Sequence, residues 1–345
     1  MVKQKVTMKD IADQLGLSVN AVSLALNNKT GVGKKNKNLI IDTAEQMGYI
    51  VGTGRFGEAI AGKNLCILIK TQYFKDSDFY AKILLGVEEE AKKNGYDVLI
   101  NFTNESEDIP DCVEQNRVCG MISVGRISDE YLAKLKRYGI SIVVVDHSSM
   151  FEPIDCVISD NKLGSYKVTR LLVERGYQRI GFLGDLDYSM SIKERFFGYQ
   201  EGISLLGMKG YSITSDYVQK YCILSDIEQY VISHNLPKLI EKLKGLKQLP
   251  QAFVCSNDEA AIQFIHALNK LDYRVPDDIA IVGFDNISLS AAVTPKLTTV
   301  NVHKEFMGQV AVQRLIWRMG HRSEPIESIM LSVEVVERNS MKQDI

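Results

Sequence analysis

The spacing of hydrophobic and polar residues changes near residue 50, and this change predicts two kinds of domain in one chain. Up to that point apolar residues recur at helical spacing in three short stretches, 8–15, 19–27 and 34–47, which predicts three helices joined by tight turns. From Leu65 onward, short apolar runs alternate with amphipathic stretches of helical length. Such runs are typical of parallel strands that helices cover on both faces.

The alternation of strands and helices is completed twice. Runs such as LCILI, DVLINF and SIVVVD precede residue 160, and RIGFLG, AFVCS and IAIVGF follow it. We therefore expect an all-α headpiece and an α/β core of two doubly wound parallel sheets, with a ligand crevice at the carboxyl ends of the strands. The expected boundaries are 1–50 for the headpiece, 51–63 for a hinge and 64–345 for the core, with 64–161 and 293–322 in the N-lobe and 162–292 and 323–345 in the C-lobe.

Composition indicates a soluble, cytoplasmic protein that does not contact membranes. Hydrophobic residues make up 45% of the chain and charged residues 24%, and no apolar run approaches the roughly 18 residues that a membrane-spanning helix requires. The first residues, MVKQKVTMKDIADQL, lack the apolar segment of a secretory leader. The six cysteines show no CxxC spacing, which favours reduced, buried thiols.

Charge is distributed unevenly along the chain. Residues 1–63 contain nine Lys and Arg and five Asp and Glu, so their net charge is 9 − 5 = +4, while the whole chain carries −2 and the remainder therefore −6. A basic module on an acidic body suits a protein that presents one end to a polyanion, although charges also cluster by chance on solvated faces.

Residues 7–26 have the turn chemistry of a helix-turn-helix unit. Thr7 and Asp10 have the spacing of a capping box, Gly16 permits a tight turn, and Ser18 can cap the second helix. An ordinary helical hairpin has similar caps, so the outward face of the second helix decides between the two interpretations. That face is the one that would enter the major groove, and it consists of Val19, Asn20, Ser23 and Leu24.

Gly52, Gly54 and Gly57 form a GxGxxG pattern. Dinucleotide binding needs a strand before this pattern and a long helix after it, and neither is predicted here. We therefore interpret the segment as a linker whose glycines disfavour helix by about 1 kcal/mol each relative to alanine.

Several long segments, in the same order along the chain, resemble the lac repressor family of bacterial transcription regulators. They are VTMKDIADQLGLSVNAVSLALNNKTGV, VISDNKLGSYKVTRLLVERGYQRIGFLGD, RFFGY at 195–199, SNDEAAI and RVPDDIAIVGFDNISLSAAVTPKLTTV. The resemblance implies a homodimer that binds a near-palindromic operator, most often as a repressor, with residues 51–63 as a hinge. It also implies a core similar to periplasmic sugar-binding proteins, with a small-molecule effector, most plausibly a sugar or sugar derivative, and no cofactor.

The resemblance also assigns DNA-binding positions. Val19, Asn20 and Leu24 occupy base-reading places, and Ile60 in the hinge occupies the place of a wedge in the minor groove. Leu24 departs from the arginine common in the family, so we expect no strong guanine requirement at that step of the operator. The phosphate-contacting places are occupied by Thr7, Ser18, Ser23, Asn27 and Tyr49.

Four polar residues end strands or begin helices where the two lobes would face each other. They are Asp146, Arg195, Asn257 and Asp285, and each matches an effector-binding position of the family. Carboxylates accept hydrogen bonds from hydroxyl groups, while arginine and amide groups donate them, so the set suits a polyol. Phe79, with Tyr73 or Tyr188 as alternatives, would supply a stacking face.

Three further features receive other interpretations. We expect Asp160 to cap the next helix or support the lobe crossover, and Trp317 to serve lobe or dimer packing. The stretch SDIEQYVISHNLPKL does not match the family well.

Two rival classes fit the sequence less well. A solute-binding protein would share the two-lobe core without the headpiece. An enzyme would need a catalytic motif, and HExxH, P-loop, GxSxG and metal-spaced Cys/His patterns are all missing from the sequence. We therefore expect neither catalysis nor a metal site.

Overall fold

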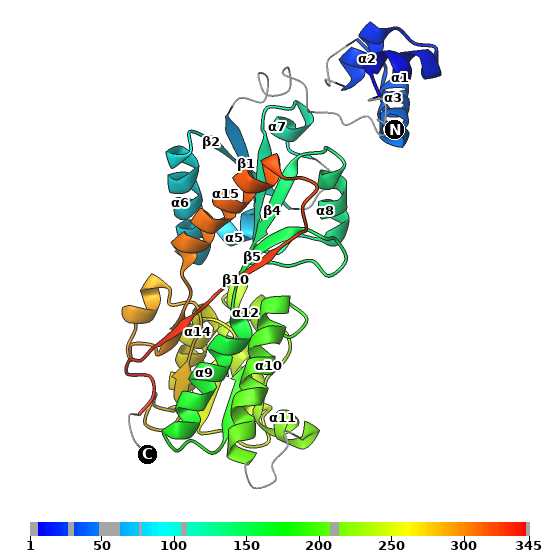
Figure 1. The fold of residues 1–345 in the computed structure, drawn as a ribbon. Helices are drawn as coiled ribbons and strands as arrows, with labels where there is room; N and C mark the ends of the chain where they lie inside the picture. Colours follow the sequence, from blue (N-terminus) through cyan, green and yellow to red (C-terminus); the bar gives the residue numbers. More distant parts are fainter. Residues whose placement is uncertain are drawn as a thin grey trace.

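The structure is a computed structural model that describes residues 6–26, 31–47, 63–75, 78–104, 109–207 and 214–342. It contains a small helical headpiece and two α/β lobes (Figure 1). The predictions for Asn27, Tyr49, Ile60 and the glycines of the hinge lie outside the described residues.

The headpiece has the predicted capping chemistry. The Thr7 hydroxyl accepts a hydrogen bond from the Asp10 backbone N–H at 3.3 Å, and Asp10 Oδ2 accepts one from the Thr7 N–H at 2.7 Å, which completes the capping box. Gly16 ends the first helix at φ 64°, a left-handed conformation that favours glycine. The helices are α1 (Met8–Leu15), α2 (Val19–Leu26) and α3 (Lys34–Gln46), and their core consists of Ile11, Ala12, Val22, Ala25, Leu26, Ile40 and Ala44.

The N-lobe is built on a six-stranded sheet of order β10-β5-β4-β3-β1-β2, in which every neighbouring pair is parallel. One face packs against α6 (Asp78–Lys93) and α15 (Lys304–Gly320), and the other against α7 (Asp111–Glu114) and α8 (Asp129–Lys136). A short helix, α5 (Thr71–Lys75), follows the first strand. The strands are β1 (Asn64–Lys70), β2 (Asp97–Thr103), β3 (Gly120–Val124), β4 (Ser141–Val145), β5 (Asp155–Ser159) and β10 (Ser328–Leu331).

The helices α6 and α15 touch backbone to backbone. A methyl group on Gly86 would lie 1.9 Å from the Glu305 carbonyl oxygen, and one on Gly308 would lie 2.2 Å from the Ile83 carbonyl oxygen. Only glycine fits at these two positions, and this close approach holds α15 against the N-lobe.

The C-lobe has a three-stranded parallel sheet of order β6-β7-β8 and a separate antiparallel pair, β9 with β11. Its strands are β6 (Ile180–Leu183), β7 (Ala252–Cys255), β8 (Ala280–Val282), β9 (Thr299–Asn301) and β11 (Glu334–Val336). Its helices are α9 (Asn161–Glu174), α10 (Met190–Ser204), α11 (Ser215–Tyr221), α12 (Ile227–Ile232), α13 (Leu236–Lys244) and α14 (Asp258–Asn269), with 3-10 turns η1 (Leu205–Gly207) and η2 (Ser288–Ala291).

The structure corrects both late lobe boundaries. We expected 293–322 in the N-lobe, but Thr298 and Asn301 form bridges with Val282 and Asp285 of the C-lobe. The chain therefore returns to the N-lobe not at residue 293 but at the start of α15. We expected 323–345 in the C-lobe, but β10 pairs with β5 of the N-lobe, and the chain returns only at β11. The strands involved are only three or four residues long, and β10 and β11 are partly exposed, which leaves too weak an apolar pattern for a sequence-based boundary.

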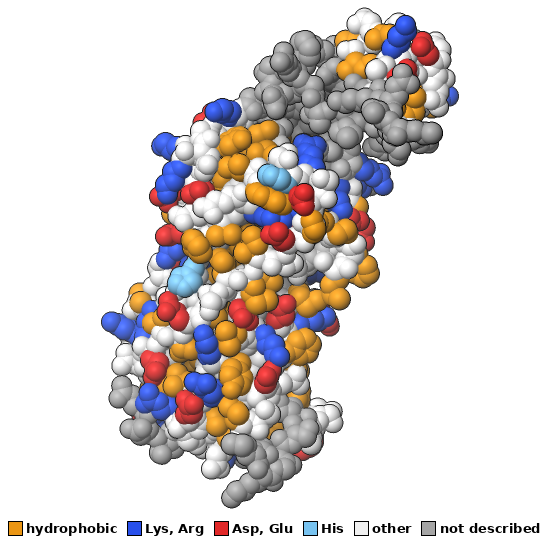
Figure 2. Space-filling view, viewed as in Figure 1, with side chains coloured by type: hydrophobic (Ala, Val, Ile, Leu, Met, Phe, Trp, Pro, Cys, Tyr) orange, Lys and Arg blue, Asp and Glu red, His pale blue; other side chains and the backbone are white. Residues whose placement is uncertain are grey.

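The visible face of the core carries both signs of charge, interspersed over the two lobes (Figure 2). In the described part of the chain, none of the helices combines the length and the apolar character required to cross a membrane.

Candidate functional site

A cavity of about 490 Å³ lies between the two lobes. Its N-lobe wall comes from the carboxyl ends of β1, β3, β4 and β5, and its C-lobe wall comes from α10, α12, α14 and the loop after β8. The five residues predicted to hold the effector all line this cavity, and Tyr73 and Tyr188 line it too. The structure thus brings together Phe79, Asp146, Arg195, Asn257 and Asp285, and their role in binding stays a prediction.

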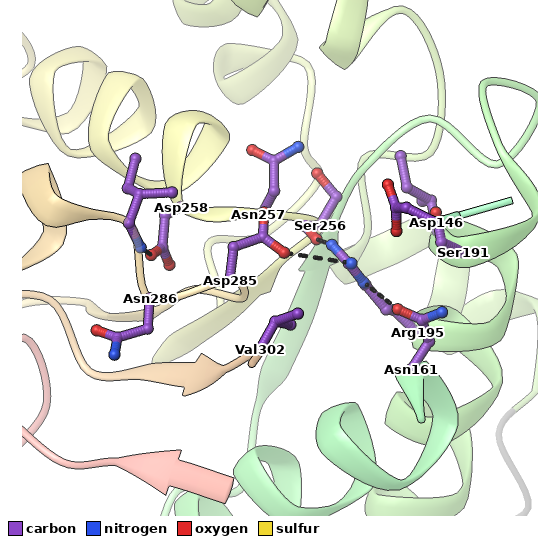
Figure 3. Close-up of polar contacts among 12 residues, drawn as sticks. Asp146, Asn161, Ser191, Arg195, Ser256, Asn257, Asp258, Asp285, Asn286 and Val302 are labelled. Atoms are coloured by element: carbon purple, nitrogen blue, oxygen red, sulfur yellow. Dashed lines mark hydrogen bonds and ion pairs between the residues drawn. The ribbon is translucent and has the colours of Figure 1, made fainter. Parts of the chain in front are cut away.

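Arg195 extends from α10 into the centre of the site, and all three of its guanidinium nitrogens have protein partners (Figure 3). Nε donates to Asn161 Oδ1 at 2.9 Å, and Nη1 donates to the Ser256 carbonyl oxygen at 2.5 Å. Nη2 lies 3.3 Å from Asp285 Oδ1. The guanidinium also lies 3.8 Å from the centre of the Phe284 ring. Arg195 is therefore a fixed, buried cation whose polar edge is already engaged.

Two carboxyl groups flank this cation. Asp285 Oδ1 is buried and makes the ion pair with Arg195, but it has no hydrogen-bond partner. Asp146 accepts one hydrogen bond, from the Tyr80 hydroxyl at 3.1 Å. Burial raises the pKa of Asp146 to about 7 and raises that of Asp285 above its ordinary value, with Arg195 acting in the opposite direction on both. Both groups retain free acceptor sites that face the cavity.

The backbones at these two carboxyl groups are unusual. Asp146 has φ 57° and Asp285 has φ 113°, both in the region that favours glycine. Such conformations cost about 1–3 kcal/mol each and persist where surrounding structure enforces them, most often at functional sites. The hydrogen bonds from Asp146 N–H to Val157 and from Asp285 N–H to Val300 hold the two residues in place.

Asn257 and Asp160 both cap helices. Asn257 Oδ1 accepts a hydrogen bond from Ala260 N–H at 2.8 Å at the start of α14, so the Nδ2 group is the part of this amide left for a ligand. Asp160 Oδ1 accepts from Leu163 N–H at 2.9 Å, as predicted, and Asp160 does not line the cavity.

Several lining residues were not anticipated from the sequence. Arg126 follows β3 and Asn161 follows β5, so the rule that ligands lie at the carboxyl ends of strands could have identified both. Tyr80 could have been found as the neighbour of Phe79 on α6. Its ring packs edge-on against Phe79 at 5.1 Å and stacks on Tyr73 at 4.9 Å, and the three form one aromatic wall.

No feature of the sequence indicated that Glu228 lines the cavity. It lies on α12, within the stretch that matches the family poorly, and its carboxylate accepts hydrogen bonds from Asp185 N–H and Ser256 Oγ, both at 2.6 Å. Burial raises its pKa to about 7. Val231 and Ile232 of the same helix line the cavity as well. This segment therefore forms part of the C-lobe wall of the cavity.

Hydrogen bonds join the lobes on both sides of the cavity. Arg126 Nη1 of the N-lobe donates to the Tyr188 carbonyl oxygen of the C-lobe at 2.5 Å. Asp78 Oδ2 of α6 accepts from Ser288 N–H of η2 at 2.7 Å, and Lys82 Nζ donates to Ser288 Oγ at 3.2 Å. The two lobes are therefore in direct contact on both sides of the cavity.

The second helix of the headpiece, α2, carries the four residues predicted to face outward. Val19 is 46% exposed and Asn20 is exposed, while Ser23 and Leu24 are half-buried. Ser18 Oγ accepts from Ala21 N–H at 3.1 Å and so caps this helix as expected. Trp317 lies on α15 with its ring 4.4 Å from that of His321 and 4.2 Å from the Arg314 guanidinium, and it does not line the cavity.

Comparison with known proteins identifies both parts of the chain. Residues 7–51 match the family model described as "Bacterial regulatory proteins, lacI family", and residues 169–341 match the "Periplasmic binding protein-like domain". The chain belongs to the lac repressor family of bacterial regulatory proteins. The predicted family, fold class and role as a transcriptional regulator are confirmed.

Relatives of this lac repressor family member match it from end to end. The HTH-type transcriptional repressor PurR of Mannheimia succiniciproducens is 26% identical over 344 residues, which cover 98% of this chain and 99% of that protein. The probable HTH-type transcriptional repressor ExuR of Bacillus subtilis is 27% identical over 342 residues, with the same coverage.

Solved structures of the family share the fold. The complex of the transcriptional regulator CelR with cellobiose has a TM-score of 0.68 at 20% identity, and the match covers 97% of this chain and 99% of that one. The lac repressor dimer bound to operator and the anti-inducer ONPF has a TM-score of 0.65 at 21% identity, covering 98% and 99%.

Proposed function

We propose that this protein is a cytoplasmic, homodimeric repressor that binds a near-palindromic operator and whose operator affinity is set by an uncharged sugar in the cavity between the lobes. The observation that carries this proposal is the convergence of five side chains from both lobes on one cavity, in a chain that also carries a helix-turn-helix with an exposed reading row. The relatives are repressors, so we infer binding rather than catalysis.

The hydrogen-bonding groups of the cavity favour hydroxyl donors in the effector. Asp146 and Asp285 have free acceptor sites, and Asn257 offers an amide donor. The aromatic wall of Tyr73, Phe79 and Tyr80 suits the apolar face of a sugar ring. A polyol satisfies both sets of groups at once.

The charges of the cavity disfavour an anionic sugar. Among the residues that the structure describes, six carboxyl groups and two guanidinium groups line it: Asp78, Asp146, Glu194, Glu228, Glu259 and Asp285 against Arg126 and Arg195. Arg195 is engaged at all three nitrogens and Arg126 is held by Tyr188. Helix N-termini contribute about half a positive charge each, which does not offset this excess. Among the described lining residues, only Arg126 keeps guanidinium donors for a phosphate or uronate group, and the excess of carboxyl groups opposes such a ligand.

The effector is expected to act through the angle between the lobes. The chain crosses between lobes beside the cavity, and Arg126, Asp78 and Lys82 make bonds that depend on lobe closure. A ligand that contacts both lobes favours one closure angle, and in a dimer that angle sets the spacing of the two headpieces. Effector and operator affinity are then reciprocally coupled.

Binding to the chain's own upstream DNA tests this proposal. Fluorescence anisotropy over a salt series, with and without a panel of neutral hexoses, pentoses and disaccharides, should show a specific site whose affinity changes by about 5–150-fold with one sugar. Hexose phosphates and uronates of the same skeletons should have no effect. A protein that binds no specific DNA, or responds only to the anionic sugars, contradicts the proposal.

Matched variants separate the two activities. Asn20→Ala should abolish specific DNA binding while sugar binding remains, and Asp13→Asn, on the exposed surface of α1, serves as its control. Arg195→Gln should abolish the sugar response while DNA binding remains. Its control is Arg170→Gln, because Arg170 is half exposed and pairs with Glu174 on the surface of α9 and with the Tyr166 ring.

A further inference from the structure

Two cysteines of the N-lobe lie against the same amide group. Asn101 Nδ2 donates to Cys66 Sγ at 3.5 Å and to Cys112 Sγ at 3.4 Å, so the two sulfur atoms lie beside the same amide nitrogen. Cys66 is the third residue of β1, Cys112 lies on α7, and Asn101 lies on β2. We call Cys66 and Cys112 the dithiol pair.

The other four cysteines have different surroundings. All six are free thiols. Cys119 Sγ donates to the Asn64 carbonyl oxygen at 3.2 Å, and Cys222 pairs with the Tyr199 hydroxyl at 3.5 Å. Cys156 and Cys255 are buried, and burial raises the pKa of each above its ordinary value. Such thiols are inert because the thiolate is the reactive form.

The two cysteines of the dithiol pair have different roles: Cys112 is the nucleophile and Cys66 is the resolving thiol. The neighbouring Cys66 thiol lowers the pKa of Cys112, and the Asn101 amide acts in the same direction. The same thiol contact and burial raise the pKa of Cys66. Cys112 therefore forms the thiolate first, while Cys66 keeps its proton beside it.

We propose that Cys66 and Cys112 form an oxidation site that closes to an intramolecular disulfide on reaction with a hydroperoxide. The Cys112 thiolate attacks the peroxide, the O–O bond breaks, and a sulfenic acid forms as hydroxide or alkoxide leaves. The Cys66 sulfur then attacks the Cys112 sulfur and loses its proton, the S–S bond forms, and water leaves. Two thiols are oxidised and one peroxide is reduced.

The site selects a small oxidant. Cys66 is fully buried and Cys112 is only 3% exposed, so a bulky disulfide reagent has no access to either sulfur. α7 is a single turn without a side-chain hydrogen bond at its N-cap, Pro110, and short elements of this kind open locally at low cost. Figure 1 places α7 beside the end of the N-lobe at which β1 begins. The disulfide would thus tie this first strand of the N-lobe to α7.

Peptide mapping of the full-length protein tests the proposal directly. After treatment with hydrogen peroxide, free thiols are blocked with N-ethylmaleimide and the protein is digested with trypsin without reduction. Cys66, Cys112 and Cys119 fall on separate tryptic peptides, 64–70, 94–117 and 118–126. We expect a disulfide-linked species of 64–70 with 94–117, loss of two of the six thiols, and a rate that rises from pH 6 to pH 8.

An internal dose marker and two variants make the result decisive. Met150 is 77% exposed, so its sulfoxide reports the peroxide dose that the protein received. Cys119→Ser should keep the linked species and Cys112→Ser should lose it. A link to 118–126, a disulfide between two chains, or six intact thiols at a dose that fully oxidises Met150 would overturn the proposal.

Discussion

Replacing Asp146 by asparagine is expected to stabilise the N-lobe by an amount that grows with pH. The Asp146 carboxyl group is buried against the cavity and receives one hydrogen bond, from Tyr80. Burial raises its pKa to about 7, against an ordinary value of 3.8. The folded protein therefore holds this proton more tightly than the unfolded chain does. Asparagine keeps the shape of the side chain without the charge.

The size of the effect follows from these two pKa values. Between pH 4 and pH 7 the folded state binds more protons than the unfolded state, so the free energy of unfolding of the wild type falls as pH rises. A tenfold difference in proton affinity corresponds to about 1.4 kcal/mol, so the loss through this single group amounts to about 4 kcal/mol by pH 8. Asp146→Asn lacks this loss. Its stability relative to the wild type should rise by that amount from pH 4 to pH 8.

Urea unfolding at a series of pH values measures this difference. Trp317 is the only tryptophan and lies on α15 of the N-lobe, the lobe that contains Asp146, so its fluorescence follows the relevant transition. Asp97→Asn, at an exposed position at the start of β2, is the control and should show no such trend. A difference between Asp146→Asn and the wild type that stays constant, or that falls with pH, would refute the electrostatic reasoning.

Three further predictions follow from the site and the core. Sugar hydroxyls that donate to Asp146 favour its charged form, so sugar affinity should rise from pH 6 to pH 8 with release of a proton. Calorimetry in buffers of different ionisation enthalpy measures this proton release, and a pH-independent affinity would contradict the prediction. Leu24→Arg should create a preference for guanine at one step of each operator half-site, and selection from random DNA detects this; an unchanged selected sequence would count against the assigned base-reading position. Asp155→Ala should destabilise the N-lobe by about 3–5 kcal/mol because it leaves the buried Arg314 and Arg318 without their shared carboxylate. Urea unfolding measures this loss, and the control variant Glu324→Ala should have little effect.

The fold was predictable where the apolar pattern was strong. The core strands of both lobes are fully buried runs such as β3 and β7, and the headpiece was predictable from its caps, because Thr7, Asp10, Gly16 and Ser18 each act locally. The late crossings between the lobes were not predictable. Strands β9, β10 and β11 are only three or four residues long, β10 and β11 are partly exposed, and their partners lie far away in the sequence. No local pattern therefore indicates which lobe they join.

The site was predictable to the extent that it follows strand ends. Asp146 and Asp285 come directly after apolar runs, so their convergence could be expected from the sheet alone. Glu228 lies on a short helix that no strand precedes directly, and its place in the cavity depends on packing against Ser256 and Asp185. The hydrogen bonds that occupy Arg195 were also invisible in the sequence, and they change the expected effector from any sugar to an uncharged one.

The late return of the chain to the N-lobe has a consequence for biosynthesis. Five of the six strands of the sheet that α15 covers, β1 to β5, have been made by residue 159, but α15 ends only at residue 320. At about 5–20 residues per second, the ribosome needs roughly 8–30 s to make the residues in between. During that interval the nascent N-lobe exposes the surface on which Met307, Ala311 and Leu315 later pack. The headpiece can fold early on the ribosome, whereas the N-lobe can complete its core only after α15 has been made.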